Sequence, residues 1–277
     1  MEIYYVNSAG SRLDFNRFPI VLQEPEGLWS NDWKYESVIN QRNQNVISGF
    51  YKDLVKKKVS ISVFADSQEE YEQIMSEFHD ITEYDVLCNS PGRLYAAGYY
   101  LECFFISKDY FEYEESFYAI EINAQIVAPN PLWVKEYEYQ FRGIDASDDI
   151  GKKYGYRYAY RYPNGLKNSY VRNEYISDCN FKLYVFGPVL NPQVIIGSYT
   201  YLVNVLLEMG EYMIIDSREK TVKKVMNNGT IVNIFDSRDK KNSVFQKIIS
   251  GRNQIRWSGK FNFTLMLYEE RSEPKWY

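Results

Sequence analysis

Histidine is almost absent from this sequence, and its scarcity removes many kinds of catalytic and metal site. Among 277 residues the only histidine is His79. A zinc site needs several histidine or clustered cysteine ligands, and one helical histidine supplies a single ligand at most. No Gly-x-Ser-x-Gly elbow, P-loop or Gly-x-Gly-x-x-Gly turn stands between a strand and a helix. We therefore expect no enzyme, no cofactor and no bound metal.

Cysteine and long apolar runs are also scarce. The three cysteines, Cys88, Cys103 and Cys179, lie far apart and form no Cys-x-x-Cys pair. A sparse, odd set suits free thiols in a reducing compartment better than a disulfide framework. No stretch approaches the roughly 18 apolar residues that a membrane-spanning helix needs, and the N-terminus lacks the pattern of a signal peptide. The expectation is a soluble protein made in the cytoplasm, without membrane insertion.

The sequence also has no excess of basic residues over acidic ones. The net charge is -5 and the pI is about 5.2, which argues against a protein that binds nucleic acid by neutralising phosphates. Residues 145–149 place oxygen ligands with the opening spacing of a calcium loop. However, Ile150 stands where that loop needs glycine, and Tyr156 stands where it needs a bidentate glutamate. We interpret residues 145–149 as an exposed polar loop rather than a metal site.

Tyrosine, by contrast, is abundant, with 27 residues, and its large ring and polar hydroxyl favour sheets and half-wet interfaces. In an extended chain, a repeat of period two places alternate side chains on one face. Such a face suits a sugar-stacking platform, a protein interface or half of an ordinary sandwich, and the repeat alone leaves these three open. The alternating tyrosines, called here the 154–162 repeat, are Tyr154, Tyr156, Tyr158, Tyr160 and Tyr162.

Alternation of apolar and polar residues recurs along the chain and predicts half-buried strands. Clear examples are residues 59–63, 118–126 and 261–267. Alternation this frequent points to sandwiches rather than to a parallel α/β sheet. We predict a mainly β protein with two β-sandwich-type domains.

One segment has the helical period instead. Ser67 and Glu70 form a capping box, in which the serine oxygen caps the third helical amide and the glutamate reaches back. An amphipathic helix over about residues 68–82, packed on a sheet, follows from this start and from the apolar spacing after it. The apolar residues at helical spacing are Tyr71, Ile74, Met75, Phe78 and Ile81.

A domain boundary is predicted where Pro129 and Pro131 interrupt the strand pattern, because two prolines so close together cannot both continue a central strand. The predicted domains are residues 1–131, which contain the helix, and residues 132–277. The final strand, about residues 261–277, is a candidate to pack back toward the first domain.

A series of turn and strand motifs runs the length of the chain. They are Asn7–Gly10, Val59–Ile81, Pro129–Trp133, Tyr154–Tyr162, Gly187–Pro192, Gly210–Asp216, Asn228–Gly229 with Asn233, Gly251–Asn253 and Tyr268–Trp276. In this order, the motifs resemble those of the siphovirus distal tail proteins, the family that forms the ring between the phage tail tube and the host-recognition tip.

The resemblance implies a structural protein of the phage virion, assembled in the host cytoplasm. Its N-terminal β-domain would form a ring, and its C-terminal β-sandwich would be galectin-like or similar to a carbohydrate module. The resemblance also implies a homo-hexamer stacked on the tail tube protein. This ring would act as an adaptor hub that contacts the tail hub protein and carries receptor-binding or other baseplate proteins.

Several segments are candidates for the contacts of such a ring. In the first domain they are the tyrosine-rich strands at residues 94–106 and 110–118 and the polar segment at residues 29–50, which is long enough for a hairpin arm. The 154–162 repeat, with Trp133, is a candidate interface between domains or subunits. The alternative function is a carbohydrate-binding module that recognises host glycans through the same face. A glycan-active enzyme is a third class, but no carboxylate pair is marked by its surroundings.

Overall fold

The computed structural model describes residues 2–23, 26–29, 32–112, 118–143 and 167–275. The chain divides into two compact units. The first unit runs to Lys135 and includes the residues from Glu270 onward, and the second unit is Glu136–Glu269. The predicted boundary is residue 131, whereas the units divide inside strand β11 (Trp133–Phe141), whose first residues belong to the first unit.

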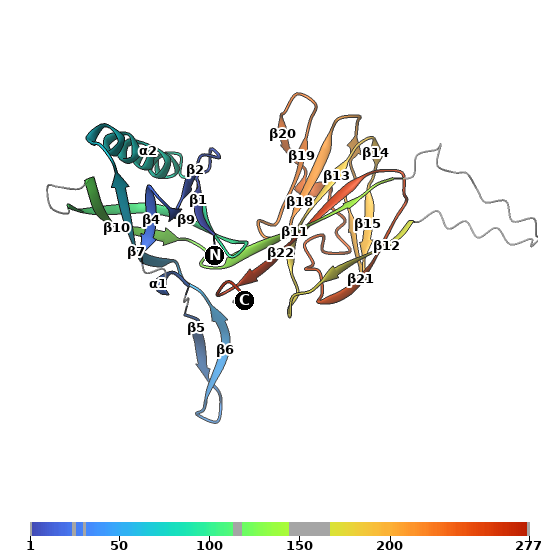
Figure 1. Ribbon diagram of the computed structural model, residues 1–277. Helices are drawn as coiled ribbons and strands as arrows, with labels where there is room; N and C mark the ends of the chain where they lie inside the picture. The colour runs from blue at the N-terminus through green and yellow to red at the C-terminus, as the bar shows by residue number, and fades with distance from the viewer. Residues whose placement is uncertain (1, 24–25, 30–31, 113–117, 144–166, 276–277) are drawn as a thin grey trace, which may run out of the picture. The chain divides into compact units, whose positions relative to one another are not determined.

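Two antiparallel sheets in the first unit share the long strand β9 (Tyr99–Glu112) (Figure 1). The first sheet contains β2 (Arg12–Asp14), β1 (Ile3–Val6), β8 (Gly92–Ala96) and the first half of β9. The second sheet contains the second half of β9, β10 (Tyr118–Ala128), β7 (Val55–Ala65), β4 (Ile20–Gln23) and β3 (Asn16–Arg17). The register of β10 against β9 shifts between Gln125 and Ile126, near the point where β9 changes sheets, and a bulge there bends the strand.

Helix α2 (Gln68–Leu87) lies against β9, β7 and β2 (Figure 1). The Ser67 hydroxyl accepts the Glu70 N–H at 3.2 Å, as predicted. The Glu70 carboxylate reaches back to the N–H of Asp66 at 2.9 Å rather than to that of Ser67, so the predicted capping box is displaced by one residue on its second arm.

The helix extends beyond its predicted end at residue 82. The apolar periodicity stops there because the buried face continues with two polar residues, Thr82 and Asp85. The Thr82 hydroxyl donates to the Phe78 carbonyl at 2.7 Å, which satisfies this buried group within the helix. The helix therefore continues through a segment whose pattern no longer predicts it.

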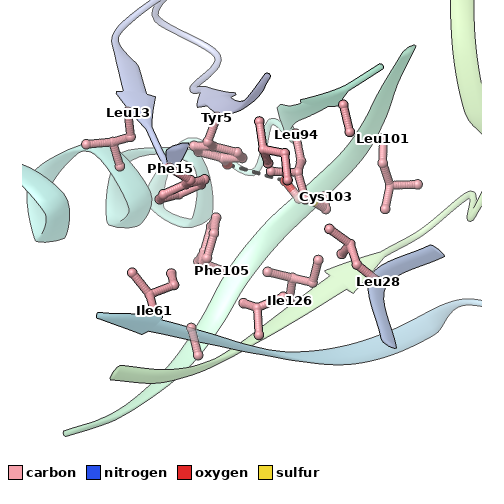
Figure 2. Packing of buried hydrophobic residues seen from close by; sticks show 14 of the residues in the cluster. Tyr5, Leu13, Phe15, Leu28, Ile61, Leu94, Leu101, Cys103, Phe105 and Ile126 are labelled. Atoms are coloured by element: carbon pink, nitrogen blue, oxygen red, sulfur yellow. Dashed lines mark hydrogen bonds between the residues drawn. The ribbon is translucent and has the colours of Figure 1, made fainter. Parts of the chain in front are cut away.

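The core of the first unit gathers side chains from both sheets and α2. Alternate residues of β7 and β10 point inward, and Ile61 and Ile122 have no exposed surface. Phe78 of α2 lies with its ring centroid 6.1 Å from that of Phe105, and Tyr5 meets Phe105 edge-on at 5.0 Å. Figure 2 shows the labelled residues of this cluster, with Tyr5 and Phe105 pointing into it.

A polar contact within this core fixes the turn between β1 and β2 to α2. The Tyr5 hydroxyl donates to Asp85 Oδ2, and the Ser8 N–H donates to Asp85 Oδ1 at 2.7 Å. The Tyr5 hydroxyl also lies 3.4 Å from the Cys103 carbonyl oxygen (Figure 2). Burial raises the pKa of Tyr5, so the hydroxyl keeps its proton as a donor.

The first unit also contains the one-turn helix α1 (Glu26–Trp29) and a hairpin of β5 (Lys34–Ile39) and β6 (Asn45–Tyr51). Among the described helices, none is both long enough and apolar enough to span a membrane.

The second unit is a sandwich of two antiparallel sheets. Side chains from both sheets form one core, which includes Phe181 and Leu265 from one sheet and Ile196 and Ile255 from the other. The first sheet contains β20 (Ile231–Asn233), β19 (Thr221–Val225), β18 (Tyr212–Asp216), β13 (Asn180–Phe186) and β22 (Phe263–Arg271). The second contains β12 (Lys167–Asn173), β21 (Gly251–Trp257), β15 (Gln193–Ile196) and β16 (Tyr199–Leu202).

Short elements complete this unit: β14 (Val189–Leu190) pairs with β17 (Leu206–Leu207), and η1 (Phe235–Ser237) is one turn of 3-10 helix. The predicted mainly β fold class is confirmed, with strands at each of the three alternating segments. The galectin-like character of the second domain stays a prediction.

Candidate interaction surface

The β5–β6 hairpin is exposed on both faces along its whole length, and Figure 1 shows it projecting from the sheets of the first unit. Tyr35 stands directly opposite Phe50. Because partner residues share a face and side chains alternate along each strand, Ile39 and Ile47 lie on that same face. The exposed fractions are 62% for Tyr35, 63% for Phe50, 68% for Ile39 and 52% for Ile47. These four residues form the apolar hairpin face.

An apolar surface of this kind is costly on an isolated molecule. A two-stranded hairpin is only marginally stable alone in water, and contiguous exposed apolar patches commonly mark interaction sites. The opposite side of the hairpin also carries apolar residues, Val38 and Val46, which pair with each other. Covering the apolar hairpin face with another protein surface would remove this cost, at roughly 25 cal/mol for each Å² of apolar area buried.

Charged contacts link the two strands at the root of the hairpin. Lys34 forms an ion pair with Asp53, and the Lys52 ammonium lies 4.4 Å from the centre of the Trp33 ring. Partial burial lowers the pKa of Lys52. The Lys34–Asp53 pair is exposed and contributes little stability.

A second feature is a row of tyrosines on the first sheet, in which Tyr4 and Tyr95 are half-buried and Tyr100 is almost fully buried. Tyr4 stacks on Tyr95 with centroids 4.6 Å apart, and Tyr95 lies 5.7 Å from Tyr100. Arginines cover the two ends: Arg12 lies 3.8 Å from the Tyr4 ring centre and Arg93 lies 4.2 Å from that of Tyr100. Tyrosine and arginine are enriched in protein interfaces, so this row is a second candidate contact.

The row is smaller than the sequence suggests. The tyrosine-rich strand at residues 94–106 is a predicted contact surface, yet Tyr99 and Tyr100 are almost fully buried. Tyr95 remains half-buried, with part of its ring at the surface. Composition marks the strand as aromatic but does not reveal which tyrosines serve the core.

The predicted site residues fall in two groups. The 154–162 repeat, Tyr154, Tyr156, Tyr158, Tyr160 and Tyr162, lies outside the described residues, as does the polar loop at 145–149. Trp133 is fully buried in the core of the first unit, where its ring centroid lies 5.3 Å from that of Trp29. A ring without exposed surface offers no face for a sugar to stack on. Trp133, which follows Pro129 and Pro131, is therefore a core residue of the first unit.

His79 lies on the exposed side of α2. Its Nε2 atom is 2.7 Å from Glu83 Oε2, and its Nδ1 atom is 3.3 Å from Lys108 Nζ. Partial burial lowers the pKa of Lys108. Across the described part of the chain, no three His, Cys, Asp or Glu residues cluster closely enough to hold a metal ion. Cys88, Cys103 and Cys179 are free thiols.

Comparisons with known proteins point to one class. No protein-family model matches the sequence, and no curated protein is a significant match. Solved structures do match over nearly the whole chain, and their class is that of phage baseplate and adsorption-hub proteins. The β-rich fold of this chain is therefore similar to that of phage baseplate and adsorption-hub proteins.

Three of the matching structures come from two phages. The Dit protein of phage SPP1, described as a paradigm of the hub adsorption apparatus in phages that infect Gram-positive bacteria, aligns with a TM-score of 0.59 and 10% identity over 97% of this chain and 98% of its own. A chain of the phage p2 baseplate in its activated conformation with strontium gives 0.60 and 12% over 98% and 99%. The calcium form gives 0.58 and 12% over 98% of each chain. The predicted resemblance to distal tail proteins is thus confirmed for the fold.

Proposed function

We propose that this protein is a structural component of a phage tail and that it forms a hexameric ring at the distal end of the tail tube. There it acts as an adaptor hub between the tail tube protein, the tail hub protein and the receptor-binding or other baseplate proteins. The protein belongs to the virion and performs no catalysis. The likeness of almost the entire chain to baseplate proteins supports this role.

The observation that carries the proposal is the apolar hairpin face. A closed ring uses heterologous contacts, in which one patch on each subunit meets a different patch on the next. The first unit presents two unlike surfaces of this kind, the aliphatic and aromatic hairpin face and the half-buried, stacked rings of Tyr4 and Tyr95. In the proposed ring, the apolar hairpin face is covered by a neighbouring copy of the chain.

The proposed ring contacts act together with contacts to the rest of the tail. Each added surface from the tail tube or hub protein makes the next contact intramolecular and raises the effective affinity. We therefore expect rings at high protein concentration or with tail partners, and monomers in dilute solution.

Electron microscopy of assembled tails tests the proposal directly. The expected density for this chain is a ring with six-fold symmetry on the tail axis, at the distal end of the tube. A monomeric component away from the axis, or a symmetry unrelated to six, would overturn it. An incubation of the purified protein with cell-wall polysaccharide tests the absence of catalysis. Saccharide release that disappears on changing one Asp or Glu would contradict that part.

A further inference from the structure

The outer face of the second sheet in the second unit collects positive charge in an acidic protein. Along β21, Asn253, Ile255 and Trp257 point inward and are buried, so Arg252 and Arg256 point outward. Arg172 of β12 stands directly opposite Arg252. Like charges in directly opposed positions of a sheet destabilise it, whereas the chain as a whole carries a net charge of -5. In this sheet each of the two has its own partner: Arg172 forms an ion pair with Glu174 at 3.7 Å, and the Arg252 guanidinium lies 3.7 Å from the centre of the Tyr170 ring.

A hollow of about 460 Å³ is lined in part by Arg256 of this face. Its volume lies within the range of small-ligand sites, about 300–1,000 Å³. Pro188 and Leu190 contribute apolar surface to its lining. None of the described residues that line it is acidic. Its polar lining consists of Asn191, Gln193, Arg256, Ser258 and Lys260.

Arg256 is the group whose environment indicates a ligand. Its Nε atom is shielded from solvent and has no hydrogen-bond partner among the described residues. A buried donor without an acceptor costs free energy, and the guanidinium stays charged at all ordinary pH values. An oxyanion in the hollow would supply the missing acceptor, because a guanidinium matches carboxylate and phosphate groups with paired N–H donors.

We propose that this hollow binds an acidic saccharide unit, with its carboxylate or phosphate group on Arg256 and Lys260. The amides of Asn191 and Gln193 and the hydroxyl of Ser258 both donate and accept, which suits the hydroxyl groups of a sugar ring. The apolar surface of Pro188 and Leu190 suits the C–H face of such a ring. This site uses neither the apolar hairpin face nor the 154–162 repeat, so its test is independent of the test of the ring proposal.

Titration calorimetry on the full chain tests the site with glucuronic acid, glucose 6-phosphate and neutral glucose as probes. We expect the two acidic sugars to bind at least about tenfold more tightly than glucose, since charge-assisted hydrogen bonds are the stronger ones. Arg256→Ala should weaken acidic-sugar binding by about tenfold or more, and Lys260→Ala should weaken it less. Arg172→Ala, on the same face but not in the lining of the hollow, is the matched control and should leave binding unchanged.

Several results would overturn the assignment. Equal affinity for glucose and glucuronic acid would remove the role of the charged pair, and absence of binding would remove the site. Acetate or inorganic phosphate that competes as strongly as the acidic sugars would exclude a saccharide site and leave a simple anion site. If Arg256→Ala fails to fold, the exposed Gln193→Ala and Lys260→Ala carry the test. Unchanged binding in both of these variants would contradict the proposal.

Discussion

Two regions of the first unit have similar strand composition but opposite surroundings. In β7, Val59, Ile61 and Val63 are buried under α2 and the neighbouring strands. In the β5–β6 hairpin, the exposed fractions of Val38, Ile39, Val46 and Ile47 lie between 46% and 68%. The comparison shows that apolar β-branched residues predict a strand, whereas the rest of the fold determines whether that strand is covered. For the hairpin, the described residues of its own chain provide no such cover.

The largest expected contrast comes from removing one aromatic ring in each region. Phe78→Ala empties a fully buried position of α2 against Phe105 and should lower the free energy of unfolding by about 3–5 kcal/mol. Phe50→Ala removes an exposed ring, so it should change that free energy by no more than about 0.5 kcal/mol in the monomer. Urea unfolding of dilute protein measures both changes. Comparable losses for the two variants would mean that the hairpin is packed in the monomer.

A pair of glycines sharpens the same comparison from the opposite direction. A Cβ atom at Gly92 would collide with the Tyr5 hydroxyl and with Asp85, both of them buried. Gly92→Ala should therefore destabilise the protein by about 1–3 kcal/mol through overpacking. At Gly49 in β6 a Cβ atom would meet nothing within 4 Å, so Gly49→Ala should be almost neutral. Thermal denaturation of the two variants provides the check, and a neutral Gly92→Ala would show that the Tyr5–Asp85 contact yields easily.

The smallest expected contrast is between a buried and an exposed ion pair. In the second unit, Glu211 accepts from Lys224 Nζ at 2.6 Å and from the Glu208 N–H at 2.7 Å, and the Lys224 hydrogen bond is the main cause that lowers the pKa of Glu211 below 4.5. A carboxyl with a lowered pKa in the folded state stabilises the protein above its ordinary pKa, and this contribution is lost as pH falls through the lowered value.

The free energy of unfolding of Glu211→Gln should therefore be lower than that of the unchanged protein at pH 7. The two free energies should converge in acid. The matched change Asp53→Asn disrupts the exposed pair with Lys34 at the hairpin root and should have little effect at either pH. A difference for Glu211→Gln that persists at low pH would contradict the ion-pair explanation.

Local patterns predicted much of this fold. The period-two segments became β7, β10 and β22, and Ser67 marks the helix start because capping depends on near neighbours alone. The helix end was missed because Asp85 looks like a solvent-facing residue until Tyr5, far away in sequence, is brought beside it. The burial of Trp133 is also non-local, since its packing partner Trp29 comes from a distant segment.

The candidate sites depended even more on non-local geometry. A hairpin arm was foreseeable from the length and polarity of residues 29–50, but the face shared by Tyr35, Ile39, Ile47 and Phe50 follows from the pairing register and its bulge. The hollow beside Arg256 joins the segments at 188–195 and 256–261, and their adjacency follows from the pairing of β15 with β21. No local pattern contains that information.

The central claim is that another copy of the chain covers the apolar hairpin face. Sedimentation velocity at high protein concentration tests it with the double change Ile47→Asp and Phe50→Asp. The control is Ile176→Asp, which alters a side chain that is 87% exposed in the second unit. We predict that the unchanged protein and the control sediment as closed oligomers, while the double variant sediments as a folded monomer with unaltered thermal stability. Oligomers of undiminished size and affinity in the double variant would contradict the account.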